Sequence, residues 1–287
     1  WNVQNNKCAN DLYSIYRIQS TCVAVGKAGQ IVRTTNGGNN WSSSPHSFSF
    51  SDMISIKAFN TSDVVGISYY DFVTSYDGGA TWENYDIPFT PTTSMYFLNS
   101  HTGWVIVSGG GIMRTTNRGL TWDNRSIQMA GPVNNVFFIN SETGWATTDN
   151  GIYKTQNSGL NWTNYVDPFF FLDYDEICFV NDLTGWTAVS SGANLSVVKT
   201  TNGGLNWVNQ TTSEWNIVAM HFLNSQTGWI ATSTNFRRTT NGGTAWDSIS
   251  AVNDITDMQF INSLTGWAAA GPLPSQASGK VYNTTNG

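Results

Sequence analysis

Short apolar runs alternate with polar breaks along the whole of this 287-residue chain. The runs are rich in Val, Ile, Phe, Tyr and Thr, and residues of the Gly, Asn, Asp and Ser types interrupt them every eight to twelve positions. No run keeps the roughly 3.6-residue period of an amphipathic helix, so the pattern indicates short β-strands joined by tight turns. The sequence therefore predicts an all-β fold.

Two motifs recur along the chain at nearly constant spacing. The first is a Thr-Thr-Asn-Gly-Gly turn shortly before a tryptophan, and its copies end at Trp41, Trp82, Trp122, Trp162, Trp207 and Trp246, which are 41, 40, 40, 45 and 39 residues apart. The second ends in Thr-Gly-Trp, at Trp104, Trp145, Trp186, Trp229 and Trp267. A period of this length with about four strands is typical of a β-propeller blade.

The two ends of the chain complete the count of blades. The last residues, KVYNTTNG, are a seventh copy of the first motif that stops at Gly287, and Trp1 lies 40 residues before Trp41. If Trp1 completes that copy, the first residues supply the outer strand D of a blade whose strands A to C come from the C-terminal segment. We therefore predict a single domain over residues 1–287, a seven-bladed β-propeller of four-stranded antiparallel blades with adjacent termini. Such a module also suits a larger multidomain or assembled protein.

Most of the recurring residues have structural explanations. The Asn or Asp of the first motif is expected to accept hydrogen bonds from its own turn, and a following Gly supplies a positive φ. The tryptophans of both motifs are expected to pack within and between blades. A basic residue precedes the Thr pair in five copies, which predicts a blade feature and not a converging anion site: Arg33, Arg114, Lys154, Lys199 and Arg238.

Composition narrows the class of protein. Charged residues are only 11% of the chain, while Asn, Thr, Ser, Gly and Trp are abundant, which is typical of secreted or surface proteins. The net charge of −6 and the scattered basic residues argue against a nucleic-acid partner. No stretch approaches 18 apolar residues, so we expect no membrane insertion. No signal peptide precedes Trp1, so we expect that any export signal has been removed. We predict an extracellular or cell-surface location, with the periplasm or an organelle lumen as the alternative.

Signals for metals, cofactors and nucleophiles are weak. The three cysteines, Cys8, Cys22 and Cys178, show no zinc-type spacing, although the sequence leaves a Cys8–Cys22 disulfide open. The three histidines are isolated, and neither H-E-x-x-H nor G-x-S-x-G occurs. We therefore expect no cofactor, no metal and no catalytic residue.

The repeated turns resemble a known family of motifs. TTNGGNNW and SYDGGATW are similar to the Asp-box, or bacterial neuraminidase repeat, and the pairing of TGW with this box is most similar to propellers of the photosystem II stability and assembly factor type. The resemblance covers nearly the whole chain and implies a propeller whose boxes lie at the rim, away from the ligand. It does not choose between enzymes and binding proteins. This chain has Asn in six of the seven boxes, and Asn caps such a turn as well as Asp does.

The candidate binding residues lie in the connections that vary most between repeats, the D-to-A and B-to-C loops. The densest aromatic and acidic cluster is Phe169, Phe170, Phe171, Asp173, Tyr174 and Asp175, and we expect Tyr69, Tyr70 and Trp215 on the same face. Such groups suit stacking on sugars or a protein hot spot, and PFFFL alternatively plugs the channel mouth. Carboxylates for a glycosidase would come from Asp71, Asp173, Asp175, Glu176 and Glu214.

The sequence thus predicts a non-catalytic recognition or assembly module for a protein or glycan ligand. A glycoside hydrolase acting on a polysaccharide is the first alternative. A photosystem II assembly-like factor is the second, ranked lower because no basic patch is evident on the loop face. The sequence does not identify the ligand.

Overall fold

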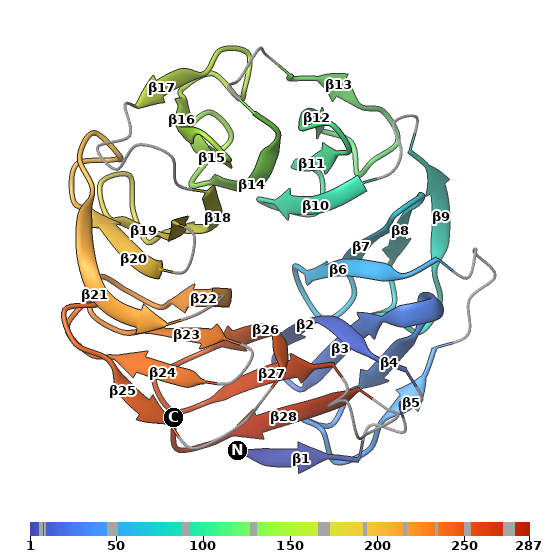
Figure 1. The fold of residues 1–287 in the computed structure, drawn as a ribbon. Helices are drawn as coiled ribbons and strands as arrows, with labels where there is room; N and C mark the ends of the chain where they lie inside the picture. Colours follow the sequence, from blue (N-terminus) through green and yellow to red (C-terminus); the bar gives the residue numbers. More distant parts are fainter. Residues whose placement is uncertain are drawn as a thin grey trace.

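The computed structural model describes residues 1–5, 8, 10–44, 51–87, 92–126, 131–165, 173–191, 194–214, 217–232, 235–249, 254–271 and 279–287. Seven four-stranded antiparallel sheets surround a central axis (Figure 1). The predicted all-β, seven-bladed propeller is therefore confirmed. Blades 1 to 6 are β2–β5, β6–β9, β10–β13, β14–β17, β18–β21 and β22–β25, and blade 7 is β26–β28 with β1.

Each blade runs from an inner strand A to an outer strand D. The A strands are β2 (Leu12–Ile18), β6 (Met53–Ala58), β10 (Thr92–Phe97), β14 (Val133–Phe138), β18 (Asp173–Phe179), β22 (Ile217–Phe222) and β26 (Ile255–Phe260). The B strands are β3 (Thr21–Gly26), β7 (Val64–Ser68), β11 (Gly103–Val107), β15 (Gly144–Thr148), β19 (Gly185–Ser191), β23 (Gly228–Thr232) and β27 (Gly266–Ala270).

The outer half of each blade holds strands C and D. The C strands are β4 (Ile31–Thr34), β8 (Asp71–Ser75), β12 (Gly111–Thr115), β16 (Gly151–Thr155), β20 (Asn194–Thr200), β24 (Phe236–Thr239) and β28 (Lys280–Thr284). The D strands are β5 (Ser42–Ser43), β9 (Glu83–Asp86), β13 (Asp123–Asn124), β17 (Thr163–Tyr165), β21 (Val208–Glu214), β25 (Asp247–Ile249) and β1 (Asn2–Gln4). The 3-10 helix η1 (Lys27–Gly29) lies between β3 and β4.

The ring closes as the sequence predicts, because β1 from the N-terminus pairs with β28 from the C-terminus. Asn2 lies opposite Asn283 and Gln4 opposite Val281, and the two termini lie side by side in Figure 1. Trp1 packs edge-on against Phe236 and Phe260, with ring centroids 5.1 and 5.7 Å away. Blade 7 therefore gains its fourth strand and part of its core from the start of the chain.

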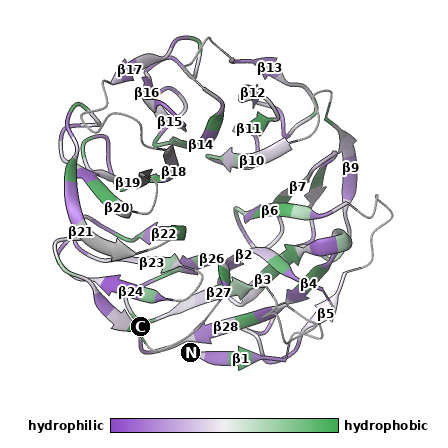
Figure 2. Cartoon of the chain, viewed as in Figure 1, coloured by the Kyte–Doolittle hydropathy of each residue, from purple (hydrophilic) through white to green (hydrophobic). Residues whose placement is uncertain are grey.

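Burial falls from the middle strands toward the rim. The B strands β7, β15, β23 and β27 are buried throughout, because they are covered by strands A and C and by the neighbouring blades. Outer strands such as β1, β13 and β17 are largely hydrophilic (Figure 2). The apolar core is thus divided into clusters that lie mainly between adjacent blades.

Four blade interfaces share one aromatic stack. The tryptophan of a B strand lies flat against a phenylalanine at the end of the next blade's A strand, and the other face of this phenylalanine covers a glycine of its own B strand. The stacked pairs, with centroid distances of 3.5, 3.6, 3.7 and 3.6 Å, are Trp104–Phe138, Trp145–Phe179, Trp186–Phe222 and Trp229–Phe260. The predicted packing of Thr-Gly-Trp tryptophans between blades is confirmed at these interfaces.

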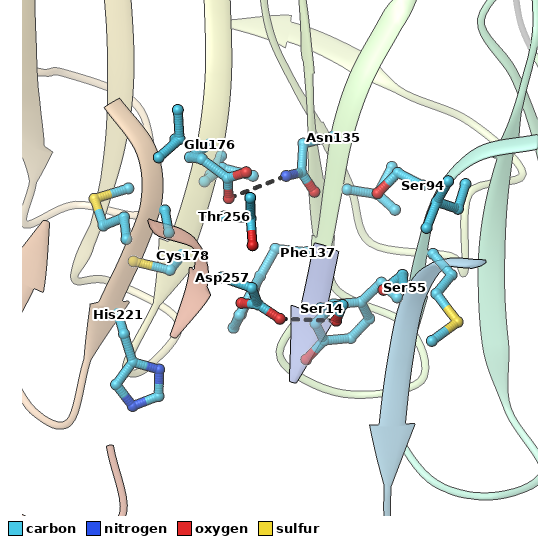
Figure 3. Close-up of a pocket in the computed structure, with 18 of the residues that line it drawn as sticks. Ser14, Ser55, Ser94, Asn135, Phe137, Glu176, Cys178, His221, Thr256 and Asp257 are labelled. Carbon is cyan, nitrogen blue, oxygen red and sulfur yellow. Dashed lines mark hydrogen bonds between the residues drawn. The ribbon is translucent and has the colours of Figure 1, made fainter. Parts of the chain in front are cut away.

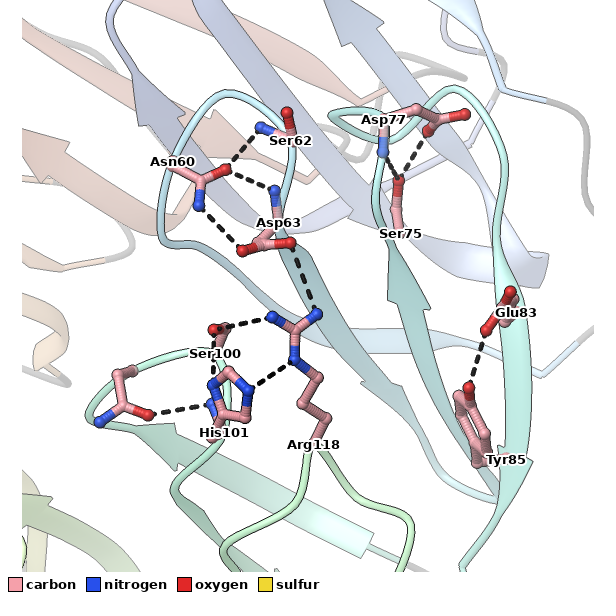
Figure 4. Close-up of polar contacts among 11 residues, drawn as sticks. Asn60, Ser62, Asp63, Ser75, Asp77, Glu83, Tyr85, Ser100, His101 and Arg118 are labelled. Atoms are coloured by element: carbon pink, nitrogen blue, oxygen red, sulfur yellow. Dashed lines mark hydrogen bonds and ion pairs between the residues drawn. The ribbon is translucent and has the colours of Figure 1, made fainter.

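The interfaces near the closure use other contacts. Arg17 holds the phenylalanine position of blade 1, and its guanidinium carbon lies 3.5 Å from the centroid of Trp267. Blade 2 has Val65 in place of the tryptophan, and there Arg118 of blade 3 reaches across. Arg118 pairs with Asp63 at 3.5 Å and donates to His101 Nε2 at 3.2 Å (Figure 4). Cationic side chains thus add to the apolar packing between blades where the stack is absent.

Two of the basic residues before the Thr pair donate to the turn of the following blade. Arg33 Nε donates to the Gly78 carbonyl at 2.6 Å, and Lys154 Nζ donates to the Gly203 carbonyl at 3.2 Å. Arg114, Lys154, Lys199 and Arg238 lie over the tryptophans Trp104, Trp145, Trp186 and Trp229. Their interpretation as blade features is supported.

The Asn and Asp boxes share two hydrogen bonds. Asn36 Oδ1 accepts from Thr34 Oγ1 and from the Asn40 amide, both at 2.9 Å. Asp77 Oδ1 accepts from Ser75 Oγ at 2.8 Å and from the Thr81 amide at 2.9 Å. The second glycine of the box has φ between +84° and +98°, as at Gly119 and Gly243. An Asn therefore keeps the two shared contacts of this turn, whereas Asp77 Oδ2 also accepts from Thr81 Oγ1 at 2.6 Å.

Acid sensitivity is expected at Asp77. Burial raises its pKa, but hydrogen bonds from Thr81, Ser75 and Ala80 outweigh burial and lower the pKa from 3.8 to about 2. Because the folded pKa lies below the unfolded one, the stabilisation by Asp77 is complete above about pH 4 and is lost as the pH falls through about 2. We expect urea unfolding to show less acid destabilisation in Asp77→Asn than in the wild type. Asn157→Asp in another box is the reciprocal control and should gain acid sensitivity; equal pH profiles for all three proteins would contradict this account.

The two faces of the propeller carry different connections. On the loop face, the Thr92 amide donates to the Tyr69 carbonyl at 3.0 Å and the Gly279 amide donates to the Asn10 carbonyl at 2.9 Å, so D-to-A and B-to-C loops meet there. On the turn face, the Gly203 amide donates to the Leu183 carbonyl at 2.8 Å, which joins a C-to-D turn to an A-to-B turn. The predicted grouping of the variable loops on one face is confirmed.

Candidate functional site

The main cavity of the described residues is the axial channel between the A strands. A volume of about 550 Å³ is lined by hydroxyl, carboxylate, aliphatic and aromatic side chains, and an adjoining volume of about 330 Å³ shares several lining residues. The residues that face it include Ser14, Ser55, Ser94, Asn135, Glu176, Thr256 and Asp257 (Figure 3). A channel of this size and polarity suits a hydrogen-bonding ligand such as a peptide side chain or a sugar.

Along this channel, side chains of one blade form hydrogen bonds with backbone amides of the next blade. The A strands are sheet edges whose inner amides and carbonyls lack a strand partner. Asp257 Oδ2 accepts from the Ile15 amide at 2.9 Å and from Ser14 Oγ at 2.7 Å, and Ser14 Oγ accepts from the Ile56 amide at 3.2 Å. Asn135 Nδ2 donates to Glu176 Oε2 at 3.3 Å. The polar residues of the A strands therefore help to hold the ring together as well as line it.

Burial shifts the ionisation of three channel residues. It raises the pKa of Asp257 from 3.8 to about 6, against the opposing hydrogen bonds from Ile15, Ser14 and Met258. It lowers the pKa of Lys57 to about 8, and Lys57 Nζ lies 4.5 Å from the Tyr96 ring centroid. It also lowers the pKa of His221 to about 4, against a hydrogen bond with the Phe260 carbonyl, to which Nε2 donates at 3.1 Å. At neutral pH Asp257 is mostly ionised and His221 is neutral.

Tyr69 and Tyr70 project from a hydrogen-bonded hairpin on the loop face. They are 41% and 58% exposed, whereas Asp71 behind them is only 7% exposed. Asp71 accepts from Ser68 Oγ at 3.0 Å and from Asn84 Nδ2 at 2.9 Å, and Ser68 Oγ accepts from the Tyr70 amide at 3.1 Å. These contacts fix the backbone that presents both tyrosines, which lowers the entropy cost of using them to bind a partner.

Tyr13 joins this hairpin to the channel. It lines the cavity, and its hydroxyl donates to Asp52 Oδ2 at 3.4 Å. Burial, the carboxylates of Asp52 and Asp11, and the nearby Tyr69 raise the pKa of Tyr13 to about 12. Tyrosines and carboxylates therefore lie together beside the channel, between blades 1 and 2.

The structure separates the residues that the sequence placed in one cluster. Tyr69 and Tyr70 are exposed on the loop face, but Tyr174 is 1% exposed and packs in the core with Trp145 and Phe179. Tyr174 is therefore corrected from a candidate contact residue to a core residue. Phe169, Phe170, Phe171 and Trp215 lie outside the described residues, as do the side chains of Asp173 and Asp175.

The predicted hydrolase carboxylates are separated in a similar way. Asp71 is buried and hydrogen-bonded within its hairpin, whereas Glu176 lines the channel; the side chain of Glu214 lies outside the description. Sequence analysis missed Tyr13 and the channel residues Asp257 and His221 as members of the site. The available signal was an ionisable residue within a predicted A strand, as in ITDMQF and IVAMHF.

Some other features bear on chemistry. No group of three or more His, Cys, Asp or Glu side chains within the described ranges could hold a metal ion. Cys8, Cys22 and Cys178 form no disulfide, so the Cys8–Cys22 bridge left open by the sequence is not formed, although both residues lie in one core cluster of blade 1 and its neighbour. No helix among the described residues is long and apolar enough to cross a membrane.

The fold and the repeated turns define an Asp-box β-propeller. Residues 54–169 match the family model described as photosynthesis system II assembly factor YCF48, which confirms the resemblance seen in the sequence. A search of curated proteins found no match.

Solved structures share the whole ring. A structure titled YCF48 bound to D1 peptide is 17% identical, with a TM-score of 0.77 and coverage of 100% of this chain and 97% of that one. YCF48 from Cyanidioschyzon merolae is also 17% identical, with a TM-score of 0.76 and coverage of 99% and 98%. The GH74 enzyme of Niastella koreensis is 13% identical, with a TM-score of 0.78, and this chain spans 54% of it. At such identities the similarity establishes the fold, which binding proteins and enzymes share.

Proposed function

We propose that this propeller is a non-catalytic assembly factor that binds a segment of a partner protein on its loop face. The observation that carries the proposal is the exposed Tyr69–Tyr70 pair, which a hydrogen-bonded hairpin presents beside a polar channel of about 550 Å³. Exposed tyrosines on a fixed backbone are typical of protein hot spots. The family match and the relative titled as bound to a D1 peptide support a peptide ligand over a glycan. The assembly-factor hypothesis, ranked last from the sequence, is therefore preferred.

A peptide selection tests this function. The purified propeller is panned against a displayed library of random heptapeptides, and enriched peptides are then titrated in solution. We expect Tyr69→Ala/Tyr70→Ala to weaken binding by about tenfold or more, as loss of a hot spot does. The matched control is Tyr76→Ala, because Tyr76 is 44% exposed but belongs to a turn-face box. A library that yields no specific peptide, or a Tyr69/Tyr70 variant that binds normally, would overturn the proposal.

The aromatic cluster predicted from the sequence remains part of this proposal. A triple alanine variant of Phe169, Phe170 and Phe171 that stays folded should lose peptide affinity. If it binds as the wild type does, the contact surface is limited to the blade 1 and blade 2 side of the loop face.

A glycoside hydrolase is the second candidate, on one specific observation. Glu176 and Asp257 line the same channel, and the raised pKa of Asp257, about 6, suits a general acid. Against it, both oxygens of Asp257 accept hydrogen bonds from blades 7 and 1. Release of reducing sugar from polysaccharides, abolished by Asp257→Asn or Glu176→Gln, would favour the enzyme.

We also propose a compartment outside the cytosol, with the periplasm or an organelle lumen preferred. The low charge content agrees with export. The similarity to assembly factors gives no support to the extracellular or cell-surface location first predicted. Cell fractionation of the source organism tests this.

A further inference from the structure

Resting on the proposed function, we propose that the bound protein segment is basic and inserts a lysine or arginine side chain into the loop-face mouth of the axial channel. The site consists of the described residues Tyr13, Asp52 and Tyr69 beside the mouth, and Glu176 and Asp257 within the channel wall. We call it the acidic mouth.

The first argument is the separation of charge between the two faces. Among the described residues, the loop face and channel carry the carboxylates Asp11, Asp52, Asp71, Asp149, Glu176, Asp254 and Asp257 against the basic residues Lys27, Lys57 and Lys280. Lys27 pairs with Asp11 at 3.7 Å. The other face carries the basic residues Arg33, Arg114, Arg118, Lys154, Lys199 and Arg238 at or next to its C-to-D turns, against the carboxylates Asp63, Asp77, Glu142 and Asp182. An approaching peptide therefore meets an excess of negative charge on the loop face only.

The second argument is the chemistry of the channel wall. An ammonium or guanidinium group offers donors and no acceptor. The wall presents the hydroxyls of Ser55, Ser94 and Thr256 together with the carboxylates of Glu176 and Asp257 (Figure 3). Hydroxyl and carboxylate oxygens both accept from a cation, and charge-assisted hydrogen bonds are the stronger kind. An acidic side chain would gain less there, because it would bring a third carboxylate between the two already present.

The third argument is the aromatic approach to the channel. Tyr13 lines the cavity and Tyr69 lies near it with 41% of its surface exposed. The apolar stem of Lys or Arg packs on such rings, and the cationic head is attracted to their faces. The carboxylate of Asp52, which binds the Tyr13 hydroxyl, adds negative charge at the same place. The apolar stem of a lysine or arginine would therefore pack on the tyrosine rings, and its cationic head would lie near the carboxylates.

The test uses peptides selected on the intact propeller and synthetic nonapeptides with one central lysine flanked by Gly and Ser. We expect Lys or Arg to be enriched about threefold or more among the selected peptides, and acetylation of the central lysine to weaken binding about tenfold. Glu176→Gln and Asp257→Asn should each weaken the lysine peptide and bring its affinity close to that of the acetylated one. Glu83→Gln and Asp123→Asn, in outer strands, are the matched charge controls and should bind normally.

The outcomes separate this inference from the function on which it rests. If no peptide is enriched, the proposed function fails. If peptides are enriched without basic residues, or if lysine and acetyl-lysine peptides bind equally, the peptide-binding function stands and the acidic mouth is wrong. Circular dichroism of Asp257→Asn checks its fold, and Glu176→Gln keeps the test decisive if that variant unfolds. Binding of a glycan or of a divalent cation alone, abolished by the same variants, would also overturn the inference.

Discussion

Deletion of residues 1–5 is expected to lower the free energy of unfolding by about 4 kcal/mol or more, because it removes strand β1 and a large core side chain. Trp1 packs against Phe236 and Phe260 at 5.1 and 5.7 Å, and Gln4 Nε2 donates to Asn283 Oδ1 at 2.9 Å. Without β1, strand β28 also becomes an open edge. Urea unfolding followed by tryptophan fluorescence measures the loss.

Val3→Ser is the control for this deletion. Val3 is 58% exposed, so its side chain contributes little while the strand stays paired. We expect nearly wild-type stability from this variant. Equal unfolding midpoints for the deletion and Val3→Ser would show that β1 is not needed to close the ring.

Gly144→Ala is expected to destabilise the propeller by about 3 kcal/mol, at the upper end of the cost of an added methyl group in a packed core. The new Cβ would lie 2.4 Å from Cδ1 of Phe138. The ring cannot retreat, because its other face is stacked on Trp104 with centroids 3.5 Å apart. Gly144 is not among the residues of positive φ, so the cost is one of space and not of backbone strain.

A double-variant cycle isolates that contact. Phe138→Ala alone should cost about 3–5 kcal/mol, and the pair should cost less than the sum, because the new methyl enters the space that the ring leaves. Cys22→Ala in blade 1 is the control: it keeps a Cβ at the equivalent position, where Arg17 replaces the phenylalanine, and should cost about 1 kcal/mol. Additive costs in the cycle would refute the steric explanation.

The lack of space beneath the phenylalanine ring also explains why phenylalanine and glycine occur together in the repeats. Five blades have Phe at the end of strand A and Gly at the start of strand B. Where the phenylalanine is absent, so is the glycine: Ala58 lies opposite Val64, and Arg17 opposite Cys22. The side chains change together because one occupies the space above the other.

The residues of the candidate site could be predicted only in part from the sequence. Tyr69 and Tyr70 follow from the rule that variable loops are free of structural duties, and their exposure agrees with it. Tyr174 was misassigned because the sequence analysis placed it in the D-to-A loop, whereas it belongs to strand β18 (Asp173–Phe179), which contains a β-bulge between Tyr174 and Ile177. A bulge interrupts the alternation of side chains between the two faces of a strand. The side on which a residue before the bulge lies therefore cannot be predicted from the residues after it.

The sequence by itself determined the strands, the seven blades, the box turns and the closure, since each depends on local periodicity and turn chemistry repeated along the chain. Only the tertiary structure decided which side chains meet at the axis. Ser14, Asp257 and Glu176 come from three different blades, and no local pattern records their separation in space. The loss of backbone partners at the inner sheet edges, which arises only when the ring closes, is the physical reason that polar residues occupy these strands.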